Sequence, residues 1–314
     1  MFGIDRFHIG STEDREAITG CTVMLFDGGA VSSVDIRGAS PGTRETALLA
    51  PDKQMNRVDA ILFTGGSAYG LAAATGVVKF LAERGIGYTT PWRVVPIVPG
   101  AVIFDLNIGR SDAFPDDRMG YRACEAAIDN RFSKGSHGAG TGATVGKWAG
   151  LNHAMKSGQG VGLASKDKVK VAAVAVVNAV GDVYDLSGSF VAGAQVEGKP
   201  VSDNTKEVER IVRSQLPGAN TTLVSVVTNA NLSKTELNRI AQRCHDSLAR
   251  RIVPVHTSYD GDAVFASSTC EIEAQFELVA ALASDAVSGA ILEGVMSAEP
   301  LGSFVSYSDL HHEK

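Results

Sequence analysis

The sequence has few cysteines and no grouping of them. Four cysteines lie far apart in 314 residues, with no C-x-x-C pair, at positions Cys21, Cys124, Cys244 and Cys270. This spacing argues against a disulfide framework or a thiolate metal site and predicts buried free thiols in a reducing cytosol. The seven histidines likewise form no spaced metal-binding pair. We therefore expect no metal and no other cofactor.

An excess of positive charge and a long apolar run are also missing. The formal net charge is −6 and the pI is about 5.7, so no basic surface is expected to bind nucleic acid or a membrane. No unbroken apolar run reaches the roughly 18 residues that a membrane span needs. A signal peptide has a basic start followed by an apolar block, and the first eight residues show neither feature. These features predict a cytoplasmic protein.

What the sequence does contain is material for a large core, since 44% of its residues are hydrophobic. Predicted strands and helices are mixed but do not alternate as regular βαβ units, which favours an α+β fold with helices covering sheet layers. The clearest strands are expected at Val58–Phe63, Lys170–Asn178, Thr222–Thr228 and Val264–Ser267, and the clearest helices at Ala68–Arg84, Met119–Asp129 and Glu271–Met296.

Local signals add three further predictions. Cys21–Phe26 and Val31–Ile36 resemble a hairpin that turns at Asp27-Gly28-Gly29. Ser233 and Glu236 fit a capping box that opens an amphipathic helix. Residues 186–220 are mostly polar and predict a connector, with a short helix near 206–213, and Val183–Asp185 is the expected return strand after Asn178.

The most informative position is the junction between Asn220 and Thr221. A polar segment ends at Asn220, and a β-branched, apolar strand begins at Thr221. A chain could cut itself there: the hydroxyl would attack the preceding carbonyl and leave a threonine with a free α-amine as its base. The alternative is a simple loop running into a strand.

Ser67 also stands at a strand-turn-helix junction. The hydrolase motif G-x-S-x-G is not matched, because Gly65 fits but Tyr69 occupies the second glycine position. The hydroxyl is better explained as the N-cap of the following helix. The alternative is that Ser67 shapes a substrate pocket.

A glycine-rich stretch, Gly138–Lys147, superficially resembles a phosphate loop. It does not match a Walker loop, because Thr141 stands where the first glycine belongs and Trp148 follows the lysine. We expect its backbone, including Gly140 and Gly142, to line a tight substrate pocket instead.

Three further polar residues could act in catalysis. Asn178 ends an apolar strand, where it either forms a turn or donates its amide to a developing oxyanion. Asp260 and Asp262 flank Gly261, where they either form a hairpin turn or position an amine and tune a nucleophile.

Taken together, these segments resemble the DmpA/BapA-type aminopeptidases, a family of self-cleaving N-terminal-nucleophile hydrolases that includes L-aminopeptidase/D-esterases and β-aminopeptidases. The matching stretches occur in the family's order. They are Gly20–Val23, Arg37–Gly38, Pro41–Thr46, Gly65–Leu71, Val95–Pro99, Ile103–Leu106, Gly138–Gly142, Asn220–Thr222, His256–Thr257 and Asp260–Ala266.

The resemblance implies roles for individual residues. It makes Thr221 the nucleophile, Asn178 the oxyanion donor and Asp262 the acidic support. The best-known members carry a serine where this chain has Asp260, and they use a tyrosine near the position of Phe104 that this chain lacks. The implied fold is an αββα sandwich, shared with the ornithine acetyltransferases, in a homo-oligomer of αβ protomers.

The expected protein is therefore a single catalytic domain, residues 1–314, that cleaves itself into fragments 1–220 and 221–314. The mature enzyme would release N-terminal residues from short peptides, amides or esters through an acyl-enzyme. Two alternatives remain: the acyl group could pass to an amine instead of water, or the chain could stay uncut and act without catalysis.

Overall fold

The computed structural model describes residues 2–201 and 220–311. Its main sheet contains nine strands: β1 (Phe7–Asp14), β2 (Thr19–Ile36), β3 (Thr43–Arg44), β4 (Arg57–Thr64), β7 (Gly100–Val102), β10 (Gln159–Lys166), β11 (Val169–Asn178), β16 (Thr221–Ala230) and β18 (Ala263–Ile272). The α-helices of the described residues are α1 (Ser67–Gly70), α2 (Ala73–Glu83), α3 (Asp117–Ile128), α5 (Lys234–Ala249), α6 (Phe276–Met296) and α7 (Tyr307–His311).

Several smaller sheets accompany the main sheet. They pair β5 (Tyr88–Thr89) with β6 (Val94–Val95), β8 (Thr144–Val145) with β9 (Met155–Lys156), β12 (Asp182–Tyr184) with β13 (Phe190–Ala192) and β17 (Ile252–Val253), and β14 (Gln195–Val196) with β15 (Lys199–Pro200). Short 3-10 turns lie at Ala47–Leu49, Gly138–Gly140, Lys147–Ala149 and Leu151–His153.

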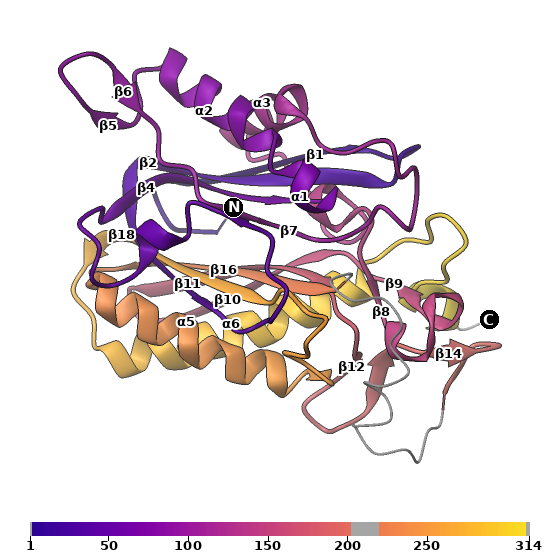
Figure 1. Cartoon of the computed structure of the whole chain (residues 1–314). Coiled ribbons are helices and arrows are strands. Elements are labelled where there is room, and N and C mark those ends of the chain that lie inside the picture. Colours follow the sequence, from indigo (N-terminus) through magenta and orange to yellow (C-terminus); the bar gives the residue numbers. More distant parts are fainter. Residues whose placement is uncertain (1, 202–219, 312–314) are drawn as a thin grey trace.

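The elements form four layers, as predicted for an αββα sandwich. Along the main sheet the strand order is β10-β11-β16-β18-β2-β4-β7-β3, with β1 beside β2. The sheet folds over so that its two halves face each other. Helices α2 and α3 cover one half and α5 and α6 cover the other (Figure 1).

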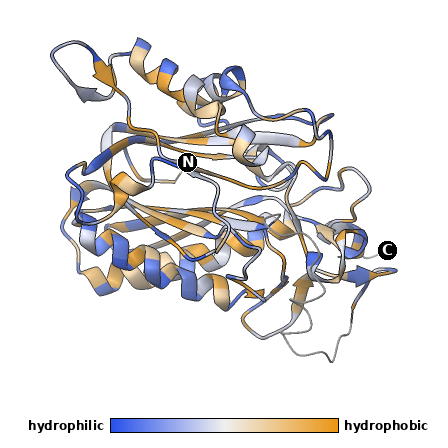
Figure 2. Ribbon diagram, viewed as in Figure 1, coloured by the Kyte–Doolittle hydropathy of each residue, from blue (hydrophilic) through white to orange (hydrophobic). Residues whose placement is uncertain are grey.

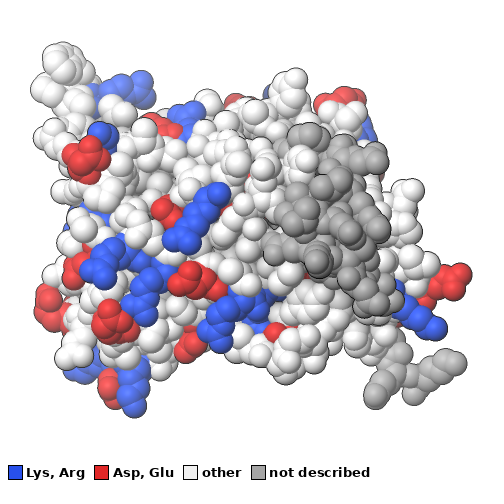
Figure 3. Space-filling model, turned by 60° about the horizontal axis from the view of Figure 1, so that its bottom comes forward, with Lys and Arg blue, Asp and Glu red and all other residues white. Residues whose placement is uncertain are grey.

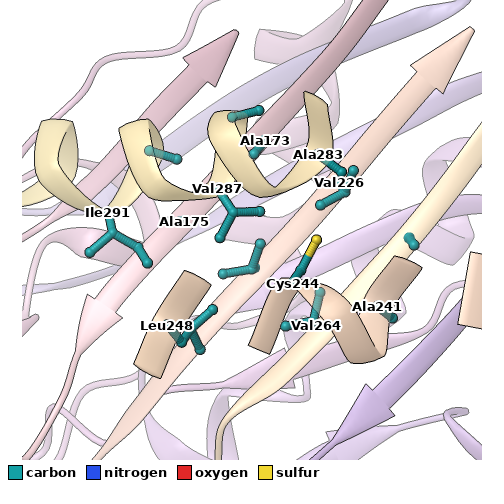
Figure 4. Packing of buried hydrophobic residues seen from close by; sticks show 14 of the residues in the cluster. Ala173, Ala175, Val226, Ala241, Cys244, Leu248, Val264, Ala283, Val287 and Ile291 are labelled. Carbon is teal, nitrogen blue, oxygen red and sulfur yellow. The ribbon is translucent and has the colours of Figure 1, made fainter. Parts of the chain in front are cut away.

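Three apolar cores hold these layers together. Successive side chains of a strand point to opposite faces of the sheet, so one strand can contribute to two cores. In β11, Ala173 and Ala175 pack toward α5 and α6, where Val287 and Leu248 meet them (Figure 4). Val174 of the same strand belongs to the core between the two halves of the sheet. A third core joins the other half to α2 and α3. Figure 2 shows the strands largely in the hydrophobic colours.

The predicted hairpin at the start of the chain is wrong. Residues 19–36 form one continuous strand, β2, which bends at Gly28 and Gly29. These glycines have φ of 72° and 73°, and the pairing of β2 with β4 shifts register between Leu25 and Ala30. The glycines therefore make a bulge and not a turn. The bend lets β2 pair with β1 before the bulge and with β18 after it.

The two long helices in the second half of the chain follow the sequence signals with one correction. The predicted capping box is confirmed: Ser233 accepts a hydrogen bond from Glu236, whose side chain bonds back. The long C-terminal helix begins at Phe276, because β18 continues to Ile272. On the outer side of the layer formed by α5 and α6, Lys and Arg side chains are interspersed with Asp and Glu (Figure 3).

Ser67 is not an N-cap. It is the first residue of the four-residue helix α1, follows Gly66 and makes no side-chain capping bond. Its φ is 52°, whereas an N-cap has an extended backbone. The longer helix, α2, starts separately at Ala73.

Helix α6 is more apolar than expected from the search for unbroken apolar runs, which found no segment long enough to span a membrane. By length and composition this helix could cross a membrane, with a mean hydropathy of 1.6 over its most apolar window. Half of that window is buried inside the protein, where Gly160 and Gly162 of β10 approach the helix backbone closely. Packing of a core helix therefore accounts for its apolar character.

The segment after Asn178 departs from the prediction. Strand β12 does not return along β11; it pairs with β13 and β17 in a separate small sheet. The 186–220 connector contains β13, β14 and β15. The predicted helix near 206–213 lies outside the described residues.

Candidate active site

Thr221 and Asn178 face each other across two neighbouring strands. Thr221 opens β16, Asn178 ends β11, and the antiparallel register pairs them directly. Strand alternation places Thr221 on the same face as Leu223 and Asn178 on the same face as Val176, and both of those side chains belong to the core between the sheet halves. Thr221 is 4% exposed and Asn178 is 0% exposed. The hydroxyl and the amide are thus held inside the sandwich.

The Asn220 carbonyl lies between a hydroxyl and a backbone donor. Asn220 forms a parallel bridge with Asp260, which lets the Gly261 N–H donate to the Asn220 oxygen at 2.9 Å. The Thr221 Oγ1 hydroxyl donates to the same oxygen. Gly261 must be glycine here, because a Cβ atom would lie 2.9 Å from Thr221 Oγ1 and 2.8 Å from the Ser40 oxygen.

Asp262 is tied to the start of β16. Its Oδ1 accepts a hydrogen bond from the Thr222 N–H at 2.6 Å, one residue past the candidate nucleophile. Its Oδ2 accepts from the His256 backbone at 3.1 Å and from His256 Nδ1 at 2.7 Å. A carboxylate that is 1% exposed therefore sits beside the position where a Thr221 amine would form.

Asp260 is buried in the same turn with a different set of partners. Its Oδ2 accepts from the Thr257 N–H at 2.9 Å and from the Thr257 hydroxyl at 2.6 Å, and its Oδ1 faces the Val180 N–H at 3.4 Å. Burial, followed by the nearby negative charge of Asp262, raises the pKa of Asp260 from 3.8 to about 7. Asp260 can therefore exchange a proton near neutral pH.

Lys147 is a candidate catalytic residue that the sequence reasoning missed. Its Nζ donates to Asn178 Oδ1 at 2.7 Å, to the Asn178 backbone oxygen at 2.9 Å and to the Thr144 oxygen at 3.1 Å. Burial lowers the pKa of Lys147 from 10.5 to about 7, against the opposing charges of Asp260 and Asp105. The available signal was a lone lysine in a glycine-rich stretch with no other charge.

The Asn178 amide is oriented by its neighbours. Its Oδ1 accepts from Lys147 and from the Thr144 N–H at 3.0 Å. Its Nδ2 donates to the Phe104 oxygen at 3.2 Å. The nitrogen is thus the donating end of the amide, at the place where β11 meets β16.

Ser67 is linked to this site through the segment after β7. The Ser67 N–H donates to the Ile103 oxygen at 2.9 Å, while Phe104 accepts from Asn178. Gly66 donates to Asp105 at 2.6 Å, and burial raises the pKa of Asp105 to about 6. Ser67 therefore lies at the edge of the site, where a role in shaping the pocket stays a prediction.

Gly140 and Gly142 are buried against the protein itself. A Cβ atom on Gly140 would lie 2.2 Å from the Gln159 nitrogen, and one on Gly142 would lie 2.4 Å from Asp105 Cβ. Buried Lys156 donates to the Gly140 and Ala143 oxygens at 3.2 and 3.0 Å. Close packing explains these glycines, and their contact with substrate stays a prediction.

A metal centre has no candidate in the described ranges. Within residues 2–201 and 220–311, no group of three or more His, Cys, Asp or Glu side chains could hold an ion. Of the four cysteines, all are free and only Cys270 is partly exposed.

Comparison of the sequence with known proteins identifies relatives of this chain. The model of peptidase family S58 matches residues 3–306. An uncharacterized aminopeptidase of Mycobacterium leprae is 39% identical, with 92% of this chain and 85% of the relative covered. A 6-aminohexanoate-oligomer endohydrolase of Agromyces sp. is 36% identical, with 84% of this chain and 73% of the relative covered.

Solved structures share the fold. The L-aminopeptidase D-Ala-esterase/amidase of Ochrobactrum anthropi, described as a variant of the Ntn hydrolase fold, superposes with a TM-score of 0.76 at 18% identity, covering 98% of this chain and 90% of that one. A β-aminopeptidase of Burkholderia sp. gives a TM-score of 0.71 at 18% identity, covering 99% and 92%. At this identity the likeness establishes the fold alone.

Proposed function

The chain belongs to peptidase family S58 and is a hydrolase acting on peptide bonds, and from that premise we propose that it is a self-processing enzyme with Thr221 as its N-terminal nucleophile. Its mature form releases N-terminal residues from short peptides, amides or esters. The observation that carries this proposal is the Asn220 carbonyl, whose oxygen accepts from both the Thr221 hydroxyl and the Gly261 N–H.

Self-cleavage uses that carbonyl as its electrophile. Thr221 Oγ1 attacks the Asn220 carbonyl carbon, and the Gly261 N–H stabilises the negative charge on the oxygen. The Asn220–Thr221 C–N bond then breaks, its nitrogen takes up a proton, and an ester joins the two residues. Water hydrolyses the ester, which leaves a carboxylate on Asn220 and a free hydroxyl and α-amine on Thr221.

Lys147 is the base that we assign to this first step. Before cleavage Thr221 has no α-amine, so another group must take the hydroxyl proton. The buried Lys147 amine has a pKa of about 7, so a large share is neutral at physiological pH, and it contacts Asn178, the residue paired with Thr221. Asp260 supplies the opposing charge that keeps this pKa from falling further.

Turnover repeats the chemistry on an external carbonyl. Thr221 Oγ1 attacks the substrate with its own α-amine as base, since an α-amine has a pKa near 8. Asn178 Nδ2 donates to the tetrahedral oxyanion, an interaction that typically contributes about 3 kcal/mol. Asp262 orients the Thr221 amine or the substrate ammonium from its place beside the Thr222 N–H.

The intact mass of the purified protein tests the proposal. In proportion to their shares of the 32.8 kDa chain, a self-cleaving threonine hydrolase yields fragments of about 23 and about 10 kDa. Sequencing of the smaller fragment should read Thr-Thr-Leu-Val-Ser-Val. A single intact mass after prolonged incubation would exclude self-cleavage.

A substrate panel then tests the activity. It should include α-, β- and D-aminoacyl p-nitroanilides and linear 6-aminohexanoate oligomers, because one group of relatives carries that substrate in its name. Each substrate is assayed with and without an amine acceptor. Release of the free amino acid supports hydrolysis, whereas accumulation of the acceptor conjugate would identify an acyltransferase.

A further inference from the structure

Asp262 has a second partner besides β16, and the proposed function leaves that partner unused. His256 donates twice to the same oxygen, Asp262 Oδ2, through its backbone N–H at 3.1 Å and its ring Nδ1 at 2.7 Å. The other oxygen, Oδ1, receives the Thr222 N–H at 2.6 Å. The carboxylate is therefore held between His256 and the residue next to Thr221.

The backbone of His256 is held in an uncommon conformation. Its φ is 55°, in the left-handed region that non-glycine residues rarely adopt. This conformation points the backbone N–H and the ring nitrogen at one carboxylate oxygen, and such local strain is frequently found where a side chain must be positioned for function.

The surroundings of the ring fix its protonation pattern. Asp262 can only accept when ionised, so Nδ1 carries the proton that is shared with it. Nε2 is buried and has no hydrogen-bond partner among the described residues. The ring of His245, from α5, meets the His256 ring edge-on with centroids 4.7 Å apart.

His245 supports the ring as a neutral packing partner. It is fully buried, its Nε2 lies 3.1 Å from the Asp35 backbone oxygen, and burial lowers its pKa to about 4. The charged groups that face the pair are thus Asp262 with Asp260 from the turn, Asp35 from β2, and Arg37, which pairs with Asp35 at 2.9 Å.

We propose that His256 is a positioning residue: its Nδ1–H holds the Asp262 carboxylate aimed at the N-terminus of β16, so that Asp262 can orient the Thr221 amine. This inference rests on the proposed function of Thr221. The role assigned to His256 is exerted through its bonds to Asp262.

Two substitutions that give side chains of the same shape, His256→Asn and His256→Asp, distinguish the loss of the hydrogen-bond donor from the loss of the ring's volume. Asn and Asp both tolerate a left-handed backbone, and both place a polar atom near the position of Nδ1. His256→Asn keeps an N–H donor to Asp262. His256→Asp replaces that donor with an acceptor and sets two carboxylates against each other.

The experiment measures, for wild type and both variants, the rate of self-cleavage, kcat and KM per mole of processed N-terminal threonine, the pH profile of kcat, and Tm. We expect His256→Asn to retain kcat within about threefold and His256→Asp to lose roughly 30- to 100-fold in kcat with little change in KM. In His256→Asp the acid limb of the profile should move to higher pH, because a second negative charge near the Thr221 amine favours the protonated form of that base.

The outcomes distinguish the two proposals. If wild type neither cleaves itself nor turns over substrate, the proposed function itself fails. If wild type is active but the Asn and Asp variants match each other in kcat and in pH profile, only the role of His256 is overturned. A purely structural role would lower Tm in both variants without moving the acid limb.

Discussion

Ser67 and Thr221 are both hydroxyl residues at the junction of a strand with a tight turn, yet their surroundings differ. Ser67 follows β4, is partly exposed, and is linked to the site by its backbone bond to Ile103. Thr221 is buried and faces the Asn220 carbonyl. Burial shifts the pKa of two groups in the same site, Asp260 and Lys147, to about 7. Burial and a carbonyl already held by a second donor, more than the local sequence, distinguish the proposed nucleophile from Ser67.

The largest effect should come from removing the Thr221 hydroxyl. Thr221→Ala is expected to stay one full-length chain with no turnover, because the attacking oxygen is gone. Thr221→Ser keeps a hydroxyl on the same atom and should still cleave. Cleavage of the alanine variant at the same bond would point to a contaminating protease and would remove the basis of the comparison.

The next largest effect should follow from replacing Lys147. Lys147→Met removes the proposed base and should slow self-cleavage by roughly 10²- to 10⁴-fold, the usual range for general base catalysis. Lys156→Met is the matched control. It removes another buried lysine whose pKa is lowered to about 7, but this lysine contacts the Gly140 and Ala143 oxygens and not Asn178.

Both lysine variants should lose stability, since buried carbonyls are left unpaired in each. The time course of fragment appearance on a gel, beside Tm, separates the two effects. Equal cleavage rates in the two variants would show that Lys147 has no special part in the reaction.

Asn178→Ala should reduce kcat by roughly 10²- to 10³-fold, the typical cost of one oxyanion donor. Self-cleavage should be less affected, because the Gly261 N–H donates to the Asn220 oxygen. Steady-state kinetics on fully processed samples measure the first effect. A kcat near that of wild type would leave Asn178 as a structural residue at the end of β11.

A smaller effect concerns stability against pH. Folding raises the pKa of Asp260 from 3.8 to about 7, so the folded chain binds this proton more tightly. Asp260 therefore contributes stability that is present below pH 4 and is lost as the pH rises to about 7. Lys147, whose pKa falls from 10.5 to about 7, costs stability below pH 7 that is regained toward pH 10.5.

Urea unfolding of Thr221→Ala, which keeps the chain intact, can measure the Asp260 contribution. Between pH 5 and pH 7 its free energy of unfolding should fall more steeply than that of the double variant Thr221→Ala/Asp260→Asn. Parallel slopes in the two proteins would mean that Asp260 is not protonated in the folded state near neutral pH.

The smallest effect is expected at Ser67. Because its side chain caps no helix, Ser67→Ala should change the free energy of unfolding by less than about 0.5 kcal/mol. It should also keep kcat within about threefold. A dead Ser67→Ala variant beside an active Thr221→Ala variant would reverse the comparison and make Ser67 the nucleophile.

The sequence was sufficient for features that depend on local pattern. The capping box at Ser233, the apolar face of α5 and the strand that starts at Thr221 all follow from short-range periodicity. The αββα arrangement came from the family resemblance and agrees with the structure, although periodicity alone gave only a mixture of helices and strands.

What failed depends on contacts between distant segments. The glycines at 28 and 29 carry the sequence signature of a hairpin turn, and only the pairing of β2 with β1, β4 and β18 makes them a bulge. Lys147 could not be recognised because its burial beneath Asn178 requires the Gly138–Gly146 segment to fold inward. Sequence patterns identify a charge, but they do not show how far it lies from water.

Trapping the acyl-enzyme tests the assignment of the nucleophile most directly, because the two hydroxyls lie in different fragments after cleavage. Processed protein is quenched in acid during turnover of a slowly hydrolysed aminoacyl ester, and both fragments are weighed by mass spectrometry. The account predicts an acyl adduct on the smaller fragment, at its first residue, Thr221. An adduct on the larger fragment, mapped to Ser67, would contradict it.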